Sequence, residues 1–154
     1  MKSIRARAPR SRSPIVRRVM QANRSFGTTS ETSLCNSLRR LGLRFRQHAN
    51  VDSSLRCRAD IVFRQVGVCV FVDGCYWHGC PKHFHAPKIN SAWWNEKIAD
   101  NRERDRRKTR ALRKIGWTVM RIWEHELRSR GADRVARRVF NIVCRKKRAP
   151  SCGH

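Results

Sequence analysis

Residues 66–85, VGVCVFVDGCYWHGCPKHFH, join an apolar run to a loop that is rich in chemically active side chains. The run through Asp73 has the composition of a strand that helices bury on both faces. The thirteen positions 73–85 contain two cysteines, three histidines, one carboxylate and two adjacent large aromatic residues. This stretch predicts an α/β fold in which a central strand delivers a functional loop.

Helices and further strands flank this central strand in the sequence. Thr28 and Glu31 have the spacing of a capping box, which predicts a helix that ends at Gly42. Glu31 could be a capping residue and nothing more. Helices are also predicted over residues 91–116 and around residues 135–143. Short apolar and β-branched runs predict three more strands: 43–47, 59–63 and 117–123. The expected order is helix, three strands, helix, strand, helix, without an internal repeat.

The charge of the chain is strongly positive. Its 154 residues include 36 Lys and Arg against 11 Asp and Glu, which gives a formal charge of +25. A polyanion is the natural partner of such a chain, and nucleic acid is the commonest one. Arginine outnumbers lysine, and its guanidinium group can form bidentate contacts with phosphate. This favours a surface that binds phosphate over one that is merely solvated. We expect a basic arm over residues 1–24 with a short helix after Pro14, one folded domain over 25–144, and a basic tail over 145–154.

The cysteine count and the hydropathy indicate a cytosolic protein. The seven cysteines are an odd number, and the chain starts without the apolar run of a signal peptide. No stretch approaches the length that spans a membrane. We therefore expect a cytoplasmic protein in which clustered thiols bind metal. Three other cysteines fall in apolar patterns and are expected to pack in the core: Cys35, Cys69 and Cys144.

The loop after the central strand has the ligand types of a zinc site. Cys75, Cys80 and His83 offer three ligands within nine positions. His125 is the best fourth ligand, because it follows a strand whose end should lie beside this loop in a parallel sheet. Four protein ligands would make the zinc structural. Two further residues remain in reserve as ligands: Cys57 and His85.

Other residues in and near the loop could perform catalysis. His78 lies between the zinc ligands and could act as a general base or acid near neutral pH. Asp60 and Asp73 lie on successive strands and could meet a few ångströms apart. Paired carboxylates suit Mg²⁺, which can assist the cleavage of a phosphodiester. A lone histidine is more often structural than catalytic. The two carboxylates nearby favour the catalytic interpretation of His78.

Polar and aromatic residues of the long helix leave two interpretations open. Asn101 and Asp105 fall on the same stripe of the helix as Trp94, either to bond a neighbouring loop or to face an active site. Large aromatic side chains could likewise be core, or could wedge between the bases of a distorted duplex. The residues concerned are Tyr76, Trp77, Trp93 and Trp94.

Five segments together resemble the very-short-patch repair (Vsr) mismatch endonucleases, over roughly residues 14–127. They are ADIVF (59–63), VFVDGCYWHGCPKH (70–83), WWNEKIADNRERD (93–105), LRKIGWTV (112–119) and RIWEHEL (121–127). The resemblance implies a restriction-endonuclease-like α/β core, with a central mixed sheet flanked by helices and one structural zinc. It also implies Mg²⁺-dependent nicking of double-stranded DNA, 5′ of the thymine in T·G mismatches that arise from deaminated 5-methylcytosine.

The resemblance also implies roles for individual residues. Asp60 would bind Mg²⁺ together with the backbone carbonyl of Val72, and His78 would be the catalytic histidine. Glu31 and Asp105 match acidic positions near the active site of the family. The aromatic residues that enter DNA from the major groove would be Tyr76, Trp77 and Trp94, and the arm before Glu31 would reach the minor groove. The zinc ligands of the family match Cys75, Cys80, His83 and His125.

The family also implies partners, namely mismatch-repair proteins and a cognate DNA cytosine methyltransferase, and we expect a monomer associated with the nucleoid. No lysine follows Asp60 at the spacing that most restriction-like nucleases use, so His78 would carry the proton transfer. Two other functions fit part of the pattern. A non-catalytic zinc-containing DNA-binding protein would leave Asp60, Asn101 and Asp105 without a role, and a restriction-like nuclease without mismatch preference would use the same fold.

Overall fold

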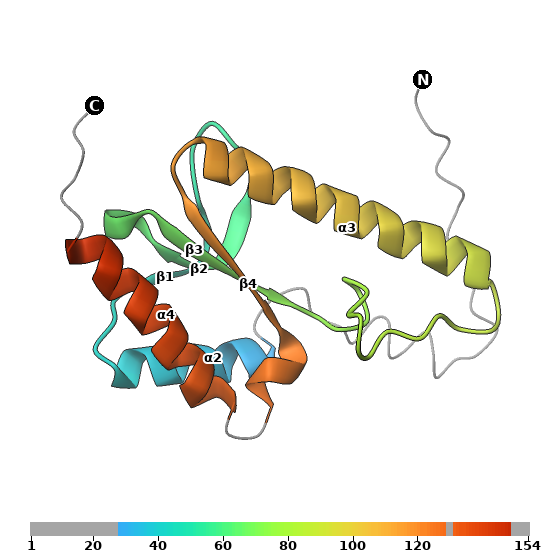
Figure 1. The fold of residues 1–154 in the computed structure, drawn as a ribbon, viewed down its shortest axis with the longest axis horizontal. Coiled ribbons are helices and arrows are strands. Elements are labelled where there is room, and N and C mark those ends of the chain that lie inside the picture. The colour runs from blue at the N-terminus through green and yellow to red at the C-terminus, as the bar shows by residue number, and fades with distance from the viewer. Residues whose placement is uncertain (1–27, 129–130, 149–154) are drawn as a thin grey trace.

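A computed structural model describes residues 28–128 and 131–148 of the chain. A mixed four-stranded sheet lies between two helices on one face and one long helix on the other (Figure 1). The arm predicted for residues 1–24 lies outside the described residues. The elements in chain order are α2 (Thr29–Arg40), β1 (Arg46–Asn50), β2 (Arg58–Phe63), η1 (Arg64–Val66), β3 (Val68–Asp73), α3 (Ser91–Lys114), β4 (Thr118–Trp123), η2 (Glu124–Leu127) and α4 (Gly131–Arg148).

The sheet has the strand order β1-β2-β3-β4. β1, β2 and β3 form antiparallel pairs, whereas β3 and β4 run parallel, with Asp73 opposite Trp123 at their carboxyl ends. The connection between these parallel strands is the loop 74–90 followed by α3. The strand ends that carry Asp73 and His125 therefore lie at the same edge of the sheet, as the sequence predicted.

Two hydrophobic clusters bury the two faces of the sheet. On one face, residues of β2, β3 and β4 pack with α2 and α4, including Leu34 and Val139. On the other face, Cys69 of β3 and Val119 of β4 pack with Leu112 of α3. Apolar residues therefore point to both sides of β3, which explains why its sequence is an uninterrupted apolar run.

The predicted elements are present, with shifted boundaries at the first strand and at the last helix. Thr28 caps α2 as expected, because its hydroxyl accepts the N–H of Glu31, and Gly42 follows the helix with a φ of 74°. The first strand begins at Arg46 and not at Leu43, because residues 43–45 connect α2 to the sheet. The last helix continues to Arg148, four residues into the expected tail. In the described part of the chain, no helix is both long and apolar enough to span a membrane.

Candidate active site

Side-chain alternation brings polar residues of two strands to the face of the sheet that α3 covers. Phe71 lies opposite Arg121 in the parallel pair, so Asp73, two residues later, shares the face of Arg121. Asp60 of β2 lies just beyond the last residues that pair with β3, beside Glu31 of α2 and His48 of β1. The site is therefore built at the ends of β2 and β3, below the middle of α3.

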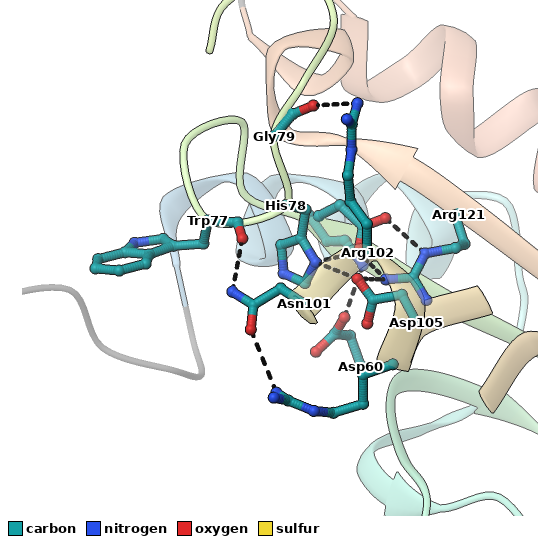
Figure 2. Close-up of polar contacts among 11 residues, drawn as sticks. Asp60, Trp77, His78, Gly79, Asn101, Arg102, Asp105 and Arg121 are labelled. Carbon is teal, nitrogen blue, oxygen red and sulfur yellow. Dashed lines mark hydrogen bonds and ion pairs between the residues drawn. The ribbon is translucent and has the colours of Figure 1, made fainter. Parts of the chain in front are cut away.

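His78 is held between two carboxylates. Its Nδ1 atom lies 2.6 Å from Asp105 Oδ2 of α3 and 3.7 Å from Asp73 Oδ1 of β3. Figure 2 shows the imidazole beside the carboxylate of Asp105, with the guanidinium of Arg121 next to it. An ionised carboxylate only accepts hydrogen bonds, so Nδ1 must donate its proton to Asp105. In the neutral ring, this leaves Nε2 with the lone pair that can accept a proton.

Arg121 neutralises the two carboxylates around His78. Its guanidinium contacts both oxygens of Asp73, at 2.7 and 2.5 Å, and lies 3.1 Å from Asp105. Burial alone would raise the pKa of Asp105, but the hydrogen bond with His78 and the charge of Arg121 hold it below its usual range. Burial alone would lower the pKa of Arg121. The hydrogen bond with Asp73 and the negative charge of Asp73 outweigh burial, so the pKa of Arg121 is raised. Arg121 thus compensates the charge of both carboxylates.

A second cluster of acidic residues lies around Asp60. Glu31, His48 and Asp60 each offer a ligand atom, and these atoms lie within 4.8 Å of one another. The backbone N–H of Val72 donates to Asp60 at 2.7 Å, just beyond the last paired residues of β2 and β3. Burial raises the pKa of Asp60 to about 6, and the charge of Glu31 adds to the effect. A cation would relieve this concentration of negative charge.

The four predicted zinc ligands converge in the loop. Cys75 Sγ lies 3.2 Å from His125 Nδ1, and Cys80 Sγ lies 3.5 Å from His83 Nδ1 and 3.6 Å from His125 Nδ1. Zinc bonds of about 2.3 Å to sulfur and about 2.1 Å to nitrogen place tetrahedral ligands about 3.5 Å apart. The reserve ligand Cys57 packs instead in the core beneath α3. The arrangement fits a tetrahedral zinc.

An aromatic cluster adjoins His78. Trp94 lies at its base with 7% of its surface exposed, and its ring centroid is 5.4 Å from that of Tyr76 and 6.0 Å from that of Trp77. Tyr76 and Trp77 are half-buried. The carbonyl of Trp77 accepts from Asn101, and its indole points away from His78 (Figure 2). The cluster thus presents two partly exposed rings on a buried tryptophan.

A family model and individual relatives all indicate the same protein family. Residues 9–84 match the sequence model of the family described as DNA mismatch endonuclease Vsr. The type II nicking enzyme V.XorIIP of Xanthomonas oryzae pv. oryzae is 40% identical over 82% of this chain and 90% of its own length. The DNA mismatch endonuclease Vsr of Escherichia coli K12 is 38% identical over 72% of this chain and 70% of its own. The chain belongs to the Vsr family. It is a Vsr-type DNA endonuclease.

Two further comparisons agree with this Vsr assignment. The type II nicking enzyme V.NaeI of Lentzea aerocolonigenes is 43% identical over 71% of this chain and 67% of its own length. The catalytic domain of the homing endonuclease I-Bth0305I has a similar fold, with a TM-score of 0.52 and 18% identity over 78% of this chain and 98% of that domain. The mixed sheet with flanking helices is therefore an endonuclease fold.

The Vsr site differs from the sequence prediction in how its carboxylates are grouped. The sequence suggested that Asp60 and Asp73 could meet and hold one Mg²⁺, but the two carboxylates belong to different ligand clusters, although the charge of Asp73 still acts to raise the pKa of Asp60. Asp73 is engaged by Arg121, whereas Asp60 lies with Glu31 and His48. The reason is the parallel register, which places Arg121 diagonally beside Asp73 at the end of the strand.

Two residues of the Vsr site escaped the sequence analysis. Arg121 is the one charged residue in the strand TVMRIW, and a charge in an apolar strand is a visible signal of a buried partner. His48 lies in β1 with a φ of 45°, a conformation rare for residues other than glycine. Its Nε2 atom is 3.7 Å from Glu31 Oε2 and its Nδ1 atom is 3.9 Å from Asp60 Oδ1. No local pattern pointed to His48.

The two clusters differ in their fitness for a divalent metal. Asp73 and Asp105 are already compensated by Arg121, so the cluster around His78 has little need of a second cation. The raised pKa of Asp60 indicates that the negative charge of this carboxylate lacks such compensation. Oxygen ligands from Asp60 and Glu31 fit the preference of Mg²⁺. The donor set around Asp60 is therefore the better candidate for a catalytic metal.

Proposed function

We propose that this Vsr endonuclease nicks one strand of double-stranded DNA, on the 5′ side of the thymine in T·G mismatches that arise from deaminated 5-methylcytosine. The observation that carries the proposal is the position of His78. It lies between the carboxylate cluster and the aromatic cluster, so one short loop links a group that can transfer protons to rings that can sense base stacking. The name of the Escherichia coli relative, a DNA mismatch endonuclease, supports the substrate.

In this proposal His78 moves the proton. Asp105 holds Nδ1 at 2.6 Å, which orients the ring and leaves Nε2 to accept a proton from the attacking water or to return one to the leaving oxygen. Asp73 and Arg121 are positioning residues, since they fix the carboxylate shell around the imidazole. Positioned acid–base catalysis of this kind contributes roughly 10²–10⁴-fold to a rate.

Asp60, with Glu31 and the backbone carbonyl of Val72, would hold the Mg²⁺. A bound Mg²⁺ supplies positive charge to the scissile phosphate. The hydrogen bond from the Val72 N–H fixes the orientation of the Asp60 carboxylate, so the ligand set is prearranged. A structural zinc on Cys75, Cys80, His83 and His125 would hold the loop that carries His78.

Mismatch sensing would use the aromatic cluster. Tyr76 and Trp77 are the partly exposed rings, and they could enter a base step that a T·G pair has weakened. Trp94 would support them from below, because it is buried in the protein alone. The remaining parts of the proposal are a cytoplasmic monomer that acts near the nucleoid, beside a cytosine methyltransferase and mismatch-repair proteins.

The test is a strand-resolved nicking assay. A labelled duplex with one T·G mismatch in a methyltransferase-type site is compared with its T·A twin, each with Mg²⁺ and with EDTA. Nicking of the thymine strand in the mismatched duplex alone, with Mg²⁺ alone, is the expected result. Cleavage of both duplexes would refute mismatch specificity. Binding without cleavage of either duplex would favour a DNA-binding role.

Two variants test the assignment of the metal site in the same assay. Asp60→Ala should reduce nicking by at least about 10²-fold and leave DNA affinity in EDTA nearly unchanged. Asp100→Ala is the matched control, because Asp100 is an exposed carboxylate on α3 and lies outside the three ligand clusters. Nicking at the normal rate by Asp60→Ala would refute the assignment.

A further inference from the structure

A groove lined with arginine lies between the second half of α3 and the edge strand β4. Its volume is about 420 Å³, and it opens beside His78. Five of its ten lining residues are arginines: Arg102, Arg106, Arg110 and Arg113 of α3, and Arg121 of β4. The two lining carboxylates, Asp73 and Asp105, are both in contact with Arg121. The remaining arginines therefore give the groove a strong net positive charge.

The four arginines of α3 follow one line along the helix. They are separated by four, four and three residues, so they lie within about 80° of one another on the helix and are about 6 Å apart along its axis. The exposed residues Arg107 and Lys114 belong to the same helix but do not line the groove. On a uniformly basic helix, the positive charges would be spread over all faces. On α3, a row of arginines lies along the groove.

Protein groups neutralise this row only weakly. Glu103 lies 3.9 Å from Arg106 and from Arg110, all on the exposed surface. In residues 28–128 and 131–148, Arg113 has no ion pair within 4.0 Å. Arg102 donates to the carbonyl of Gly79 at 2.8 Å and so has a structural role as well. Exposed ion pairs at such distances contribute little, so the guanidinium groups remain available to an anion.

Thr109 provides an independent sign that a ligand belongs in the groove. Its side chain lines the groove between Arg106 and Arg110. Its hydroxyl oxygen is shielded from solvent, and among the described residues it has no hydrogen-bond partner. A shielded hydroxyl without a partner is unfavourable, and a change of the Thr109 side-chain rotamer would let it donate its proton to a phosphate oxygen in the groove.

We infer that this groove binds consecutive backbone phosphates of the DNA strand that is cut, next to the scissile phosphate. Arginine forms bidentate contacts with phosphate, and a row along a helix can follow a strand. Because the groove begins at His78, bound phosphates would fix the position of the scissile bond along the strand. The inference rests on the proposed function only for the position of that bond, since the chain is a DNA endonuclease in any case.

The test measures DNA binding in EDTA, where no cleavage occurs. The variant Arg106→Gln/Arg110→Gln is compared with Arg107→Gln/Lys114→Gln, which removes the same charge from the same helix outside the groove. Each lost phosphate contact should reduce the slope of log K against log salt by about 0.9, so the groove variant should lose about 1.8. Between about 50 and 200 mM salt, wild type should therefore lose roughly tenfold more affinity than the groove variant. Equal slopes for the two double variants would overturn the inference.

A second measurement locates the contacts on the DNA. Uncharged methylphosphonates replace single phosphates, one at a time, on both sides of the nick site. Wild type should bind two or three of these duplexes at least about threefold more weakly, and the groove variant should bind them like the unmodified DNA. If the substitutions weaken both proteins equally, the inference is wrong. Failure of T·G-specific nicking would leave these binding results intact, because they are measured on the mismatched and the matched duplex alike.

Discussion

Asp60 shows how a single catalytic candidate bears on stability. Its side chain is 17% exposed and lies beside Glu31, so its ionised form is poorly compensated in the metal-free protein. Burial therefore raises its pKa from 3.8 to about 6. In the unfolded chain the same carboxylate titrates near its ordinary value. The folded protein is thus destabilised by this ionised group at neutral pH.

We predict that Asp60→Asn stabilises the metal-free protein at pH 7. The folded pKa lies above the unfolded one, so wild type loses stability as pH rises from about 4 to about 6, and the asparagine variant does not. A shift of about two pKa units corresponds to roughly 3 kcal/mol, and we expect a gain of about 1–3 kcal/mol. Urea denaturation in EDTA at pH 4, 5 and 7 measures it.

The pH profile of that gain is the discriminating result. The gain should shrink to less than about 1 kcal/mol at pH 4, where Asp60 is protonated in the folded protein and about half protonated in the unfolded chain. Asp52→Asn is the control, because the hydrogen bonds of Asp52 with Ser54 lower its pKa and do not raise it. That variant should show no gain at pH 7. A gain from Asp60→Asn that is independent of pH would contradict the explanation.

At the scale of elements, α3 positions the loop 74–90 by polar contacts. Asn101 donates to the carbonyl of Trp77 at 2.9 Å, and Arg102 donates to that of Gly79 at 2.8 Å. One turn further along, Asp105 contacts His78. Asn101 and Asp105 thus both bond the neighbouring loop, as one interpretation of the polar stripe expected, and a role of Asp105 in an active site stays a prediction.

We predict that Gly79→Ala disrupts the contact between this loop and α3. Gly79 has a φ of 63°, and a Cβ atom there would lie 2.4 Å from Cγ2 of the buried Ile98. Overpacking and the left-handed backbone should together destabilise the protein by about 2–4 kcal/mol, and the adjacent His78 should be displaced. Thermal denaturation and the nicking rate measure the two effects.

Gly116→Ala separates the clash from the backbone strain. Gly116 has a φ of 87°, and a Cβ atom there would meet nothing within 4 Å. This variant should be destabilised by only about 1 kcal/mol and should nick DNA at the normal rate. If Gly79→Ala were as mild as this control, the close packing of the loop on α3 would be refuted.

At the scale of the whole molecule, the proposed zinc ties distant parts of the chain together. Its ligands come from the loop after β3 and from η2 after β4. Burial raises the pKa of the Cys75 thiol, so a nearby cation is needed to favour the thiolate. The two hydrophobic clusters of the sheet include none of these ligands, so the core should survive without zinc.

We predict one zinc per chain in the purified protein. Cys80→Ser should lose the zinc and the nicking activity, and should retain the far-ultraviolet circular dichroism of the folded core. Cys57→Ser, a change at a buried cysteine outside the ligand cluster, should keep its zinc. Elemental analysis by mass spectrometry measures the metal. Full zinc content in Cys80→Ser would exclude the proposed ligand set.

The sequence by itself determined the order of the elements and the neighbourhood of the loop. The apolar run of β3 and the capping box at Thr28 are local patterns that tertiary packing did not override. The convergence of Cys75 and Cys80 with His125 was also predictable. Neighbouring parallel strands such as β3 and β4 end at the same edge of the sheet, so the residues that follow them lie close together.

Only the tertiary structure decided how charges are partnered within the site. Asp60 and Asp73 have the same local sequence signal, yet one lies with Glu31 and the other with Arg121. The arginine groove likewise requires α3 to lie against the edge strand β4. The physical reason is that partner choice depends on strand register and helix placement, which arise from contacts between residues far apart in the chain. Local periodicity carries no information about those contacts.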